Sequence, residues 1–302
     1  MPRSSHTSLV LLPIALLLVA MTSIQSGASL AKSLFPLVGA EGTTALRLGL
    51  AALILCLFMR PWRARLTLRS CRSLLAYGLS LGCMNLLFYK SLSSIPLGVA
   101  VALEFTGPLA LALLSSRRLL DFVWVALAIF GLWLLLPSHH SESHLDPLGM
   151  ALALAAGLCW ALYIIFGKQA GVEHGSHTVV LGTLIAAVLV MPVGLWHAGS
   201  SLFSVQLLPL ALAVAVLSSA LPYSLEMIAL TRLPVRTFST LMSMEPAIAA
   251  FSALLILNEQ LTVTQWLAVG AIILASAGAA ATIKPHAKPI ENMALKDPRP
   301  TS

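Results

Sequence analysis

Long apolar segments, each close to the length of a membrane-spanning helix, recur along the chain. A helix needs about 20 mostly apolar residues to cross the hydrocarbon core of a bilayer. The pattern of hydrophobic and polar positions places such segments at 9–31, 44–59, 74–95, 97–115, 122–137, 148–166, 179–197, 207–230, 237–257 and 263–283. The connections between them are too short to form a separate soluble domain. The sequence therefore predicts an all-α integral membrane protein with ten transmembrane helices.

The two halves of the chain share features at matching positions. LSSIP at 92–96 aligns with LTRLP at 230–234, and at the same offset Pro108 aligns with Pro246. Each half holds five apolar segments. Because five is an odd number, the second half must be inverted in the membrane relative to the first, an arrangement common among secondary transporters.

We therefore expect two inverted five-helix repeats, at 9–137 and 148–283, followed by a disordered cytoplasmic tail at 284–302. Arg3 and the small residues at 26–31 leave open that the first segment is a cleaved signal peptide. The repeat argues against this alternative, because the sixth segment occupies the equivalent place in the second half.

Composition and charge agree with a membrane protein. Of the 302 residues, 58% are hydrophobic and 10% are charged, whereas soluble domains average about 25% charged residues. A net charge of +7 would suggest a nucleic-acid partner for a soluble domain. Here most Lys and Arg residues fall in alternate connections, which the positive-inside rule places in the cytoplasm together with both termini. We expect a multi-pass protein in a lipid bilayer with no nucleic-acid partner.

Two carboxylates lie within apolar segments close to prolines. Glu104 precedes Pro108 by four residues, and Glu245 directly precedes Pro246. An ionisable group at the bilayer centre costs roughly 2.5–3.5 kcal/mol on insertion scales, and proline removes a backbone donor. Such costs are tolerated where the freed groups line a cavity. We expect both prolines to break helices at a transport path, where the two carboxylates bind a coupling proton or the ammonium group of a substrate.

Further polar residues within the segments are candidates for substrate binding. Gln25 and Ser29, like Asn85 and Tyr89, are four residues apart and share a helix face. A zwitterionic amino acid needs an anion near its ammonium group and hydrogen-bond donors near its carboxylate. The complete set of candidate binding residues is Gln25, Ser29, Arg47, Asn85, Tyr89 and Tyr223.

Several polar residues within the apolar segments also have a simpler, structural interpretation. Arg47, Lys32 and Lys90 can extend to the membrane interface, and the hydroxyls of the first segment can bond their own backbone. The tyrosines can serve in packing. Glu245 can belong to a structural ion pair, and Glu226 can pair with Arg232 or Arg236.

The sequence contains no motif for catalysis or metal binding. Its four cysteines have no paired spacing, so neither a disulfide framework nor a zinc site is expected. No HExxH, GxSxG or paired-Asp motif lies in a segment. We expect a protein that is not an enzyme and that uses no metal or cofactor. The rival classes are an intramembrane enzyme, a non-transporting structural or sensor protein, and a nucleotide-sugar carrier, for which few basic residues are available.

EPAIAAFSALLILNEQLTVTQWLAVGAIILASAG at 245–278 resembles the drug/metabolite transporter superfamily, in its EamA-type branch. IQSGASLAKSLFPLVGA at 24–40 and ALEFTGPLAL at 102–111 narrow the resemblance to amino-acid exporters of that branch. The resemblance implies export of L-threonine and L-homoserine across the bacterial inner membrane by proton antiport. The alternative is export of another small metabolite or a drug. The resemblance assigns no site residues, and the oligomeric state stays open.

Overall fold

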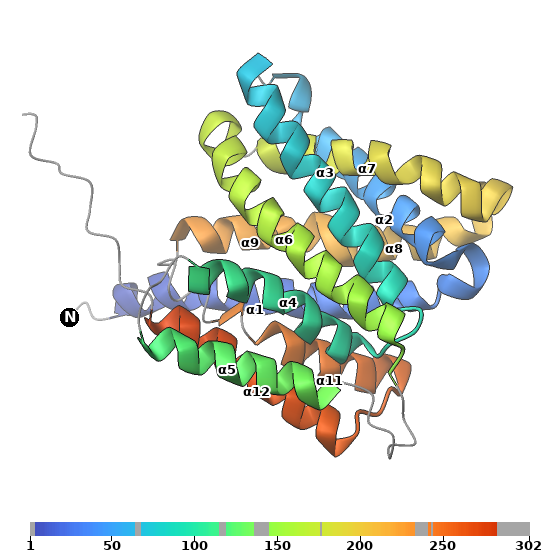
Figure 1. Ribbon diagram of the computed structural model, residues 1–302. Helices are drawn as coiled ribbons and strands as arrows, with labels where there is room; N and C mark the ends of the chain where they lie inside the picture. The colour runs from blue at the N-terminus through green and yellow to red at the C-terminus, as the bar shows by residue number, and fades with distance from the viewer. Residues whose placement is uncertain are drawn as a thin grey trace, which may run out of the picture.

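A computed structural model describes residues 4–63, 68–114, 119–135, 145–175, 177–232, 241–242 and 244–282. Within these ranges the regular structure is entirely helical (Figure 1). The helices are α1 (Ser4–Lys32), α2 (Phe35–Met59), α3 (Leu68–Ser91), α4 (Leu97–Leu114), α5 (Leu119–Leu135), α6 (Pro147–His174), α7 (His177–Ala198), α8 (Leu208–Ala215), α9 (Leu221–Arg232), α11 (Glu245–Leu257) and α12 (Val263–Thr282). A π-helical turn, η4 (Val216–Ala220), joins α8 to α9. The expected tail at 284–302 lies outside the described residues.

Several helices are long and apolar enough to cross a membrane. Six described segments meet both conditions: Leu12–Lys32, Phe35–Met59, Cys71–Ser91, Pro147–His174, His177–Phe203 and Val205–Glu226. Shorter apolar helices cover Leu97–Leu111, Phe122–Gly131, Glu245–Leu257 and Val263–Ala275. The all-helical architecture fits the predicted class of integral membrane protein, while the count of ten crossings stays a prediction.

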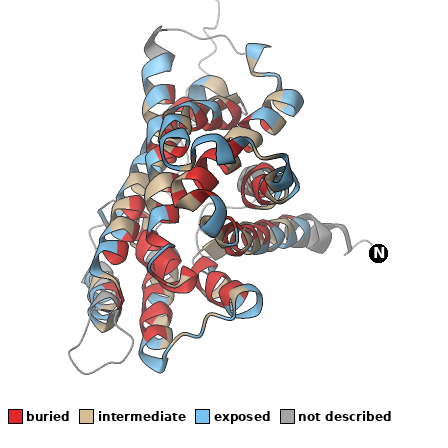
Figure 2. Cartoon of the chain, turned by 90° about the vertical axis from the view of Figure 1, so that its right-hand side faces the viewer, coloured by how far each residue is buried: buried red, intermediate tan, exposed pale blue. Residues whose placement is uncertain are grey.

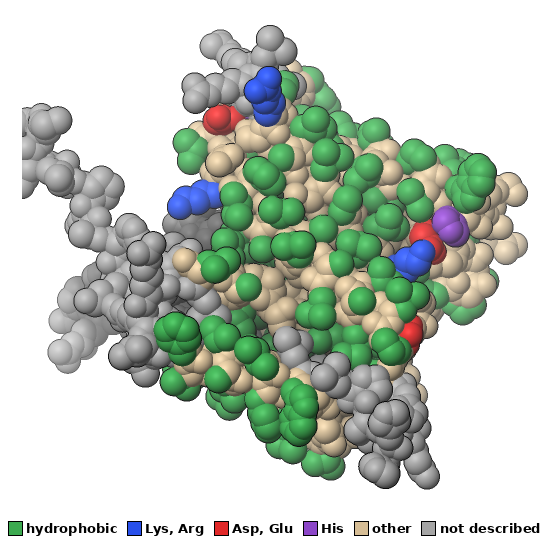
Figure 3. All heavy atoms as spheres, in the orientation of Figure 1, with side chains coloured by type: hydrophobic (Ala, Val, Ile, Leu, Met, Phe, Trp, Pro, Cys, Tyr) green, Lys and Arg blue, Asp and Glu red, His purple; other side chains and the backbone are tan. Residues whose placement is uncertain are grey.

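The surface has the polarity that contact with lipid requires. Large apolar side chains such as Phe58, Trp196 and Leu255 are exposed. In Figure 3 hydrophobic side chains cover the face formed by α3, α6 and α7, and the charged side chains lie towards its ends. In a turned view, buried residues gather where the helices meet and exposed residues lie on the outer surfaces (Figure 2). Because the outside is apolar, packing of the helices depends on close fit rather than on hydrophobicity alone.

Helices of the two halves pack directly against each other. α3 packs on α6 and α2 on α7, while α5 packs on α12 (Figure 1). α1 lies against α9, η4 and α11, and α4 lies between α6 and α11. The largest hydrophobic core cluster therefore contains residues of both halves, for example Leu48, Tyr89 and Leu103 of the first half with Ala186 and Ala249 of the second.

α2 begins earlier than the apolar pattern suggested. The expected segment began at 44, but the helix begins at Phe35, with proline in its first turn, where the missing N–H has no helical partner anyway. Gly39 interrupts the helical geometry with φ 71° and ψ 174°, a conformation that glycine adopts without strain. Glu41 lowers the apolarity of this first stretch, so the hydrophobic pattern missed it.

Pro108 does not break its helix. α4 continues through it to Leu114, so the expected helix break at this position is wrong. The physical reason is that the packing of α4 on α6 and α11 holds the helix together although proline removes one helical hydrogen bond and crowds the carbonyl four residues earlier. Pro108 has no N–H to donate to the carbonyl of Glu104, four residues earlier, and that carbonyl faces Gly157 of α6.

The crossing of α4 and α6 depends on two glycines. A Cβ atom added at Gly107 would lie 1.8 Å from the carbonyl oxygen of Gly157, and one added at Gly157 would lie 2.5 Å from the carbonyl oxygen of Glu104. Both obstacles are backbone atoms, which cannot move aside without shifting a helix. The two glycines therefore set how close Glu104 comes to the second half.

We expect Gly107→Ala to lower stability by about 2 kcal/mol or more, since overpacking against backbone forces the helices apart. Gly171→Ala, in the same helix as Gly157, is the matched control, because an added Cβ there meets nothing within 4 Å. Thermal unfolding of the purified protein in detergent, followed by tryptophan fluorescence, measures both variants. Equal unfolding temperatures for the two variants would contradict the role given to Gly107.

Candidate functional site

Arg47 of α2 is a buried cation held by uncharged groups. Its Nη2 donates to Oδ1 of Asn85 on α3, and its Nη1 donates to the carbonyl of Ser218 in η4 at 3.2 Å. Its guanidinium carbon lies 4.7 Å from the centre of the Tyr89 ring, within the range of a cation–π interaction. Arg47 is only 4% exposed, so the alternative in which it extends to the membrane interface does not hold.

Asn85 is itself fixed in orientation. Its Nδ2 donates to the carbonyl of Leu81 at 2.8 Å, which leaves the amide oxygen directed at Arg47. Asn85 and Tyr89 therefore contact the guanidinium from the same face of α3, as their spacing predicts. Tyr223 of α9 is also close enough to Arg47 to interact with its charge.

Glu245 and Gln25 join the two halves of the chain through a buried hydrogen bond. Nε2 of Gln25, on α1, donates to Oε1 of Glu245 at 2.9 Å. Glu245 is the first residue of α11 and Pro246 lies in the first turn of this helix. Among the described contacts the partner of Glu245 is this amide and not a cation. Glu245 therefore does not appear in a structural ion pair within the described part of the chain.

Glu104 completes a cluster of charges. It lies on α4, is 8% exposed, and is close enough to both Glu245 and Arg47 to interact electrostatically with them. The structure thus brings together the two carboxylates and the arginine that the sequence placed in separate segments. Their functional roles stay predictions.

Four buried polar atoms at this cluster have no hydrogen-bond partner among the described residues. Two are acceptors, Oε1 of Gln25 and Oε2 of Glu245, and two are donors, Nε of Arg47 and the hydroxyl of Tyr89. Buried polar groups are usually paired, so each unpaired atom requires an explanation. The cluster can offer acceptors to a cationic group and donors to an anionic one.

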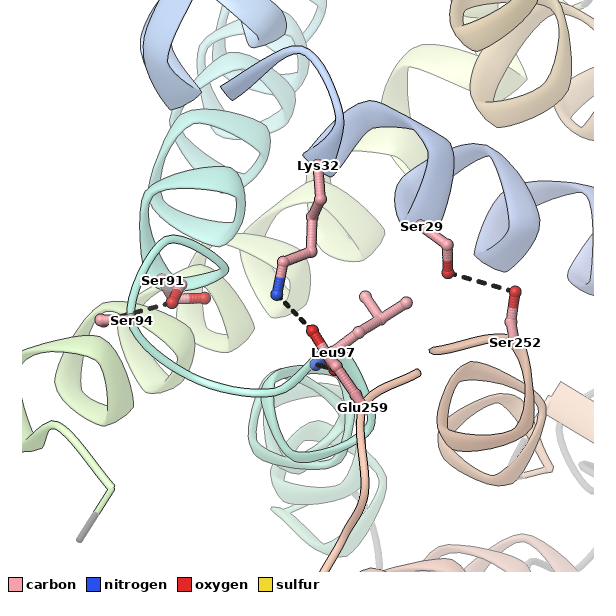
Figure 4. Close-up of polar contacts among 7 residues, drawn as sticks. All are labelled: Ser29, Lys32, Ser91, Ser94, Leu97, Ser252 and Glu259. Carbon is pink, nitrogen blue, oxygen red and sulfur yellow. Dashed lines mark hydrogen bonds and ion pairs between the residues drawn. The ribbon is translucent and has the colours of Figure 1, made fainter. Parts of the chain in front are cut away.

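α1 makes a second set of contacts through Ser29 and Lys32, four and seven residues after Gln25 (Figure 4). The hydroxyls of Ser29 and Ser252 are 3.2 Å apart. Nζ of Lys32 lies 2.5 Å from Oε1 of Glu259, whose other oxygen accepts from the backbone N–H of Leu97 at 2.9 Å. Lys32 therefore pairs within the protein instead of extending to the interface. By contrast, the side chain of Lys90 is half exposed, and its Nζ lies 3.2 Å from Oε1 of Glu41.

The sequence interpretation missed the buried residues Ser23 and Tyr77. Ser23 of α1 donates to the carbonyl of Leu217 at 2.6 Å, next to the carbonyl that Arg47 uses. Tyr77 and Tyr163 stack with ring centres 4.7 Å apart and hydroxyls 3.2 Å apart. The sequence signal for the contact of Ser23 was Pro222. It lies four residues after Ser218 and five after Leu217, and it has no N–H to donate to either carbonyl.

The described residues form neither a metal site nor a disulfide. In the described ranges no group of three or more His, Cys, Asp or Glu residues is placed to hold a metal ion. The four cysteines are free thiols. Glu226 has a buried Oε1 without a described partner, and the side chains of Arg232 and Arg236 lie outside the described residues, so the predicted pairing of Glu226 stays open.

In comparisons with known proteins, this chain is similar to transporters. A family model described as the EamA-like transporter family matches residues 147–280. The threonine/homoserine exporter RhtA of Escherichia coli K12 is 61% identical over 288 residues, which cover 95% of this chain and 98% of that protein. This chain belongs to the EamA-like transporter family. The predicted membership of the EamA-type branch is thereby confirmed.

Two further proteins and one solved structure match large parts of the chain. RhtA of Salmonella typhimurium LT2 is 62% identical over 284 residues, covering 94% of this chain and 96% of that protein. The uncharacterized transporter YwfM of Bacillus subtilis 168 is 27% identical over 204 residues, 64% of this chain and 68% of that protein. A solved crystal structure at 18% identity has a TM-score of 0.58 and covers 92% of this chain and 98% of that one. That last likeness concerns the fold alone.

The Lys32–Glu259 pair should be energetically coupled more strongly than a surface pair. Both side chains are only 19% exposed, so we expect a double-mutant cycle with Lys32→Met and Glu259→Gln to give a coupling free energy of about 1 kcal/mol or more, above the usual range for exposed pairs. Lys90 and Glu41 form the control pair, since Lys90 is 49% exposed. Equilibrium unfolding in mixed detergent micelles measures both cycles. A Lys32–Glu259 coupling no larger than that of the control pair would contradict this expectation.

Proposed function

We propose that the protein is a secondary active exporter of small amino acids, including L-threonine and L-homoserine, and that it works by proton antiport across the bacterial inner membrane. The observation that carries the substrate is the 61% identity, over nearly the whole length of both chains, to an exporter of threonine and homoserine. The buried polar cluster supports it independently, because its chemistry is complementary to an amino acid.

A zwitterion can pair each of its charges with this cluster. Arg47 is held directly by neutral acceptors, so its charge stays available for the substrate carboxylate, with the free Nε and the Tyr89 hydroxyl as donors. The unpaired oxygens of Gln25 and Glu245 suit the ammonium group. The hydroxyls of Ser29 and Ser252 suit a small hydroxylated side chain.

Proton coupling follows if a proton and a substrate compete for the same carboxylate. Glu104 and Glu245 are close enough to repel each other, so keeping both ionised costs free energy unless a cation is bound. The ammonium group of an amino acid from the cytoplasm supplies that cation in one state. A proton from outside supplies it in the other, and the exchange of one for the other constitutes antiport.

An inverted repeat of ten transmembrane helices supplies the two access states. The packing of the helices supports the repeat. If α1 corresponds to α6, and α3 to the segment α8–η4–α9, then the α3–α6 contact has its counterpart in the contact of α8, η4 and α9 with α1. The contacts α2–α7 and α5–α12 each join two corresponding helices. The family model covers residues 147–280, close to the proposed second repeat at 148–283; the first is 9–137. With both termini in the cytoplasm, the Lys32–Glu259 pair lies at the outer end and links the halves there.

Threonine transport driven by a pH gradient tests the function. In inverted membrane vesicles from cells that make this protein, we expect radiolabelled L-threonine to accumulate when the interior is acidic, and to be released when a protonophore collapses the gradient. Vesicles without the protein are the control. Accumulation that is unchanged by the protonophore would contradict antiport, and no accumulation above the control would contradict threonine as a substrate.

Glu104→Gln should abolish the gradient-driven accumulation of threonine. The glutamine amide is uncharged, so it can neither release a proton nor attract an ammonium group by opposite charge. Glu173→Gln is the matched control, because Glu173 is exposed near the end of α6. The amount of each variant in the membrane, measured by immunoblot, separates loss of coupling from loss of protein. A normal transport rate for Glu104→Gln would assign coupling elsewhere.

Competition separates this function from its alternative, export of another small metabolite or a drug. Unlabelled L-homoserine should reduce threonine accumulation, whereas aromatic compounds and lipophilic cations should not, because the cluster offers groups for both charges of a zwitterion. Inhibition by the cations alone would favour the alternative.

A further inference from the structure

The turn that binds Arg47 has an unusual backbone. η4 (Val216–Ala220) is π-helical, and the backbone N–H of Leu221 donates to the carbonyl of Val216, five residues earlier. π-Helices are rare in proteins; they appear mostly as single turns inside α-helices and are frequent at functional sites. Ser218 and Ser219 of this turn are buried, and the hydroxyl of Ser219 has no partner among the described residues.

Pro222 follows this turn and removes a donor from it. An N–H at position 222 would reach the carbonyl of Ser218 in an α-helical pattern or that of Leu217 in a π-helical one. Proline has no N–H, so neither carbonyl can receive that bond. These two carbonyls accept from side chains of other helices instead: Ser218 from Arg47 at 3.2 Å, and Leu217 from Ser23 at 2.6 Å.

The turn is also held in place from the side of α1. A Cβ atom added at Gly27 would lie 2.7 Å from the backbone nitrogen of Ser218, so the backbones of α1 and η4 are in direct contact. The carbonyl of Ser218 therefore has little freedom to move. It gives Arg47 a third fixed contact besides Asn85 and Tyr89.

We propose that Pro222 is a positioning residue for substrate binding: it denies the carbonyl of Ser218 the helical donor that another residue at position 222 would supply, and this carbonyl then orients the guanidinium of Arg47 towards the substrate carboxylate. The second half of this statement rests on the proposed function. The first half concerns Arg47 alone. A carbonyl suits this task because it fixes the cation without neutralising it, whereas a carboxylate in the same place would compete with the substrate.

Pro222→Ala restores the missing N–H and tests the proposal. Pro192→Ala is the matched control, because Pro192 also lies inside a helix, α7, but is exposed. Ser23→Ala is a second control that removes the donor to Leu217 and leaves the Arg47 contact intact. Purified variants in liposomes are assayed by threonine counterflow at equal pH, with L-threonine or L-threoninol as competitor. L-threoninol lacks the carboxylate.

We expect Pro222→Ala to weaken competition by L-threonine about tenfold, the size of one lost hydrogen bond to a charged group. Competition by L-threoninol should change much less, since it has no carboxylate to meet Arg47. Both controls should keep the wild-type ratio of the two affinities. An equal loss for both competitors would show a merely structural role, and unchanged affinities would likewise overturn the proposal.

A readout without substrate separates this inference from the proposed function. Reaction of Arg47 with phenylglyoxal, an arginine-selective dicarbonyl, can be followed by mass spectrometry of the peptide that contains it. Release from Ser218 should raise the modified fraction of Arg47 in Pro222→Ala and not in Pro192→Ala. If wild-type protein shows no threonine counterflow, the proposed substrate is wrong, and the phenylglyoxal result decides the role of Pro222. An unchanged modified fraction would overturn that role.

Discussion

A buried guanidinium in a membrane protein must be solvated by the protein itself. At Arg47 this solvation comes from an amide oxygen, a backbone carbonyl and an aromatic ring, all uncharged. Burying a charge without partners costs several kcal/mol, so the helices that bring these groups are held to a narrow arrangement. Three elements, α3, η4 and α2, meet at one side chain, and α1 packs against η4 at Gly27.

Neutral partners have a second consequence. A cation paired with a carboxylate has little attraction left for a ligand, whereas a cation held by dipoles keeps most of it. The carboxylates Glu104 and Glu245 come from α4 and α11 and lie close enough to act on the same region. The cluster therefore presents opposite charges from different helices, and a change in how the helices pack changes the separation of those charges.

The sequence predicted the helical membrane class and most of the polar cluster, because the relevant signals are local. An ionisable residue inside an apolar segment is costly wherever the segment lies in the fold, so Glu104, Glu245 and Arg47 stand out without a structure. The spacing of Asn85 and Tyr89 likewise placed them on one face. Segment ends were less predictable, as Phe35 shows, because the first turns of α2 contain a glycine and a carboxylate.

Contacts between distant segments could not be predicted in this way. Lys32 and Glu259 each have an acceptable isolated interpretation, and only the fold pairs them. Pro108 and Pro246 have the same local sequence signal but different outcomes, since one lies inside a packed helix and the other in a first turn. The π-turn at η4 depends on tertiary contacts to its carbonyls, which a single sequence does not contain.

If the polar cluster lines the path of the substrate, as proposed, a thiol placed beside it can be reached by a reagent in water. Ser29→Cys is made in protein with the four native cysteines replaced by alanine, and a membrane-impermeant thiol reagent is added to either side of the membrane. Protein that retains only the exposed Cys71 serves as the positive control. We expect the thiol at position 29 to be labelled from at least one side and L-threonine to slow the labelling. No labelling from either side, with Cys71 labelled normally, would contradict it.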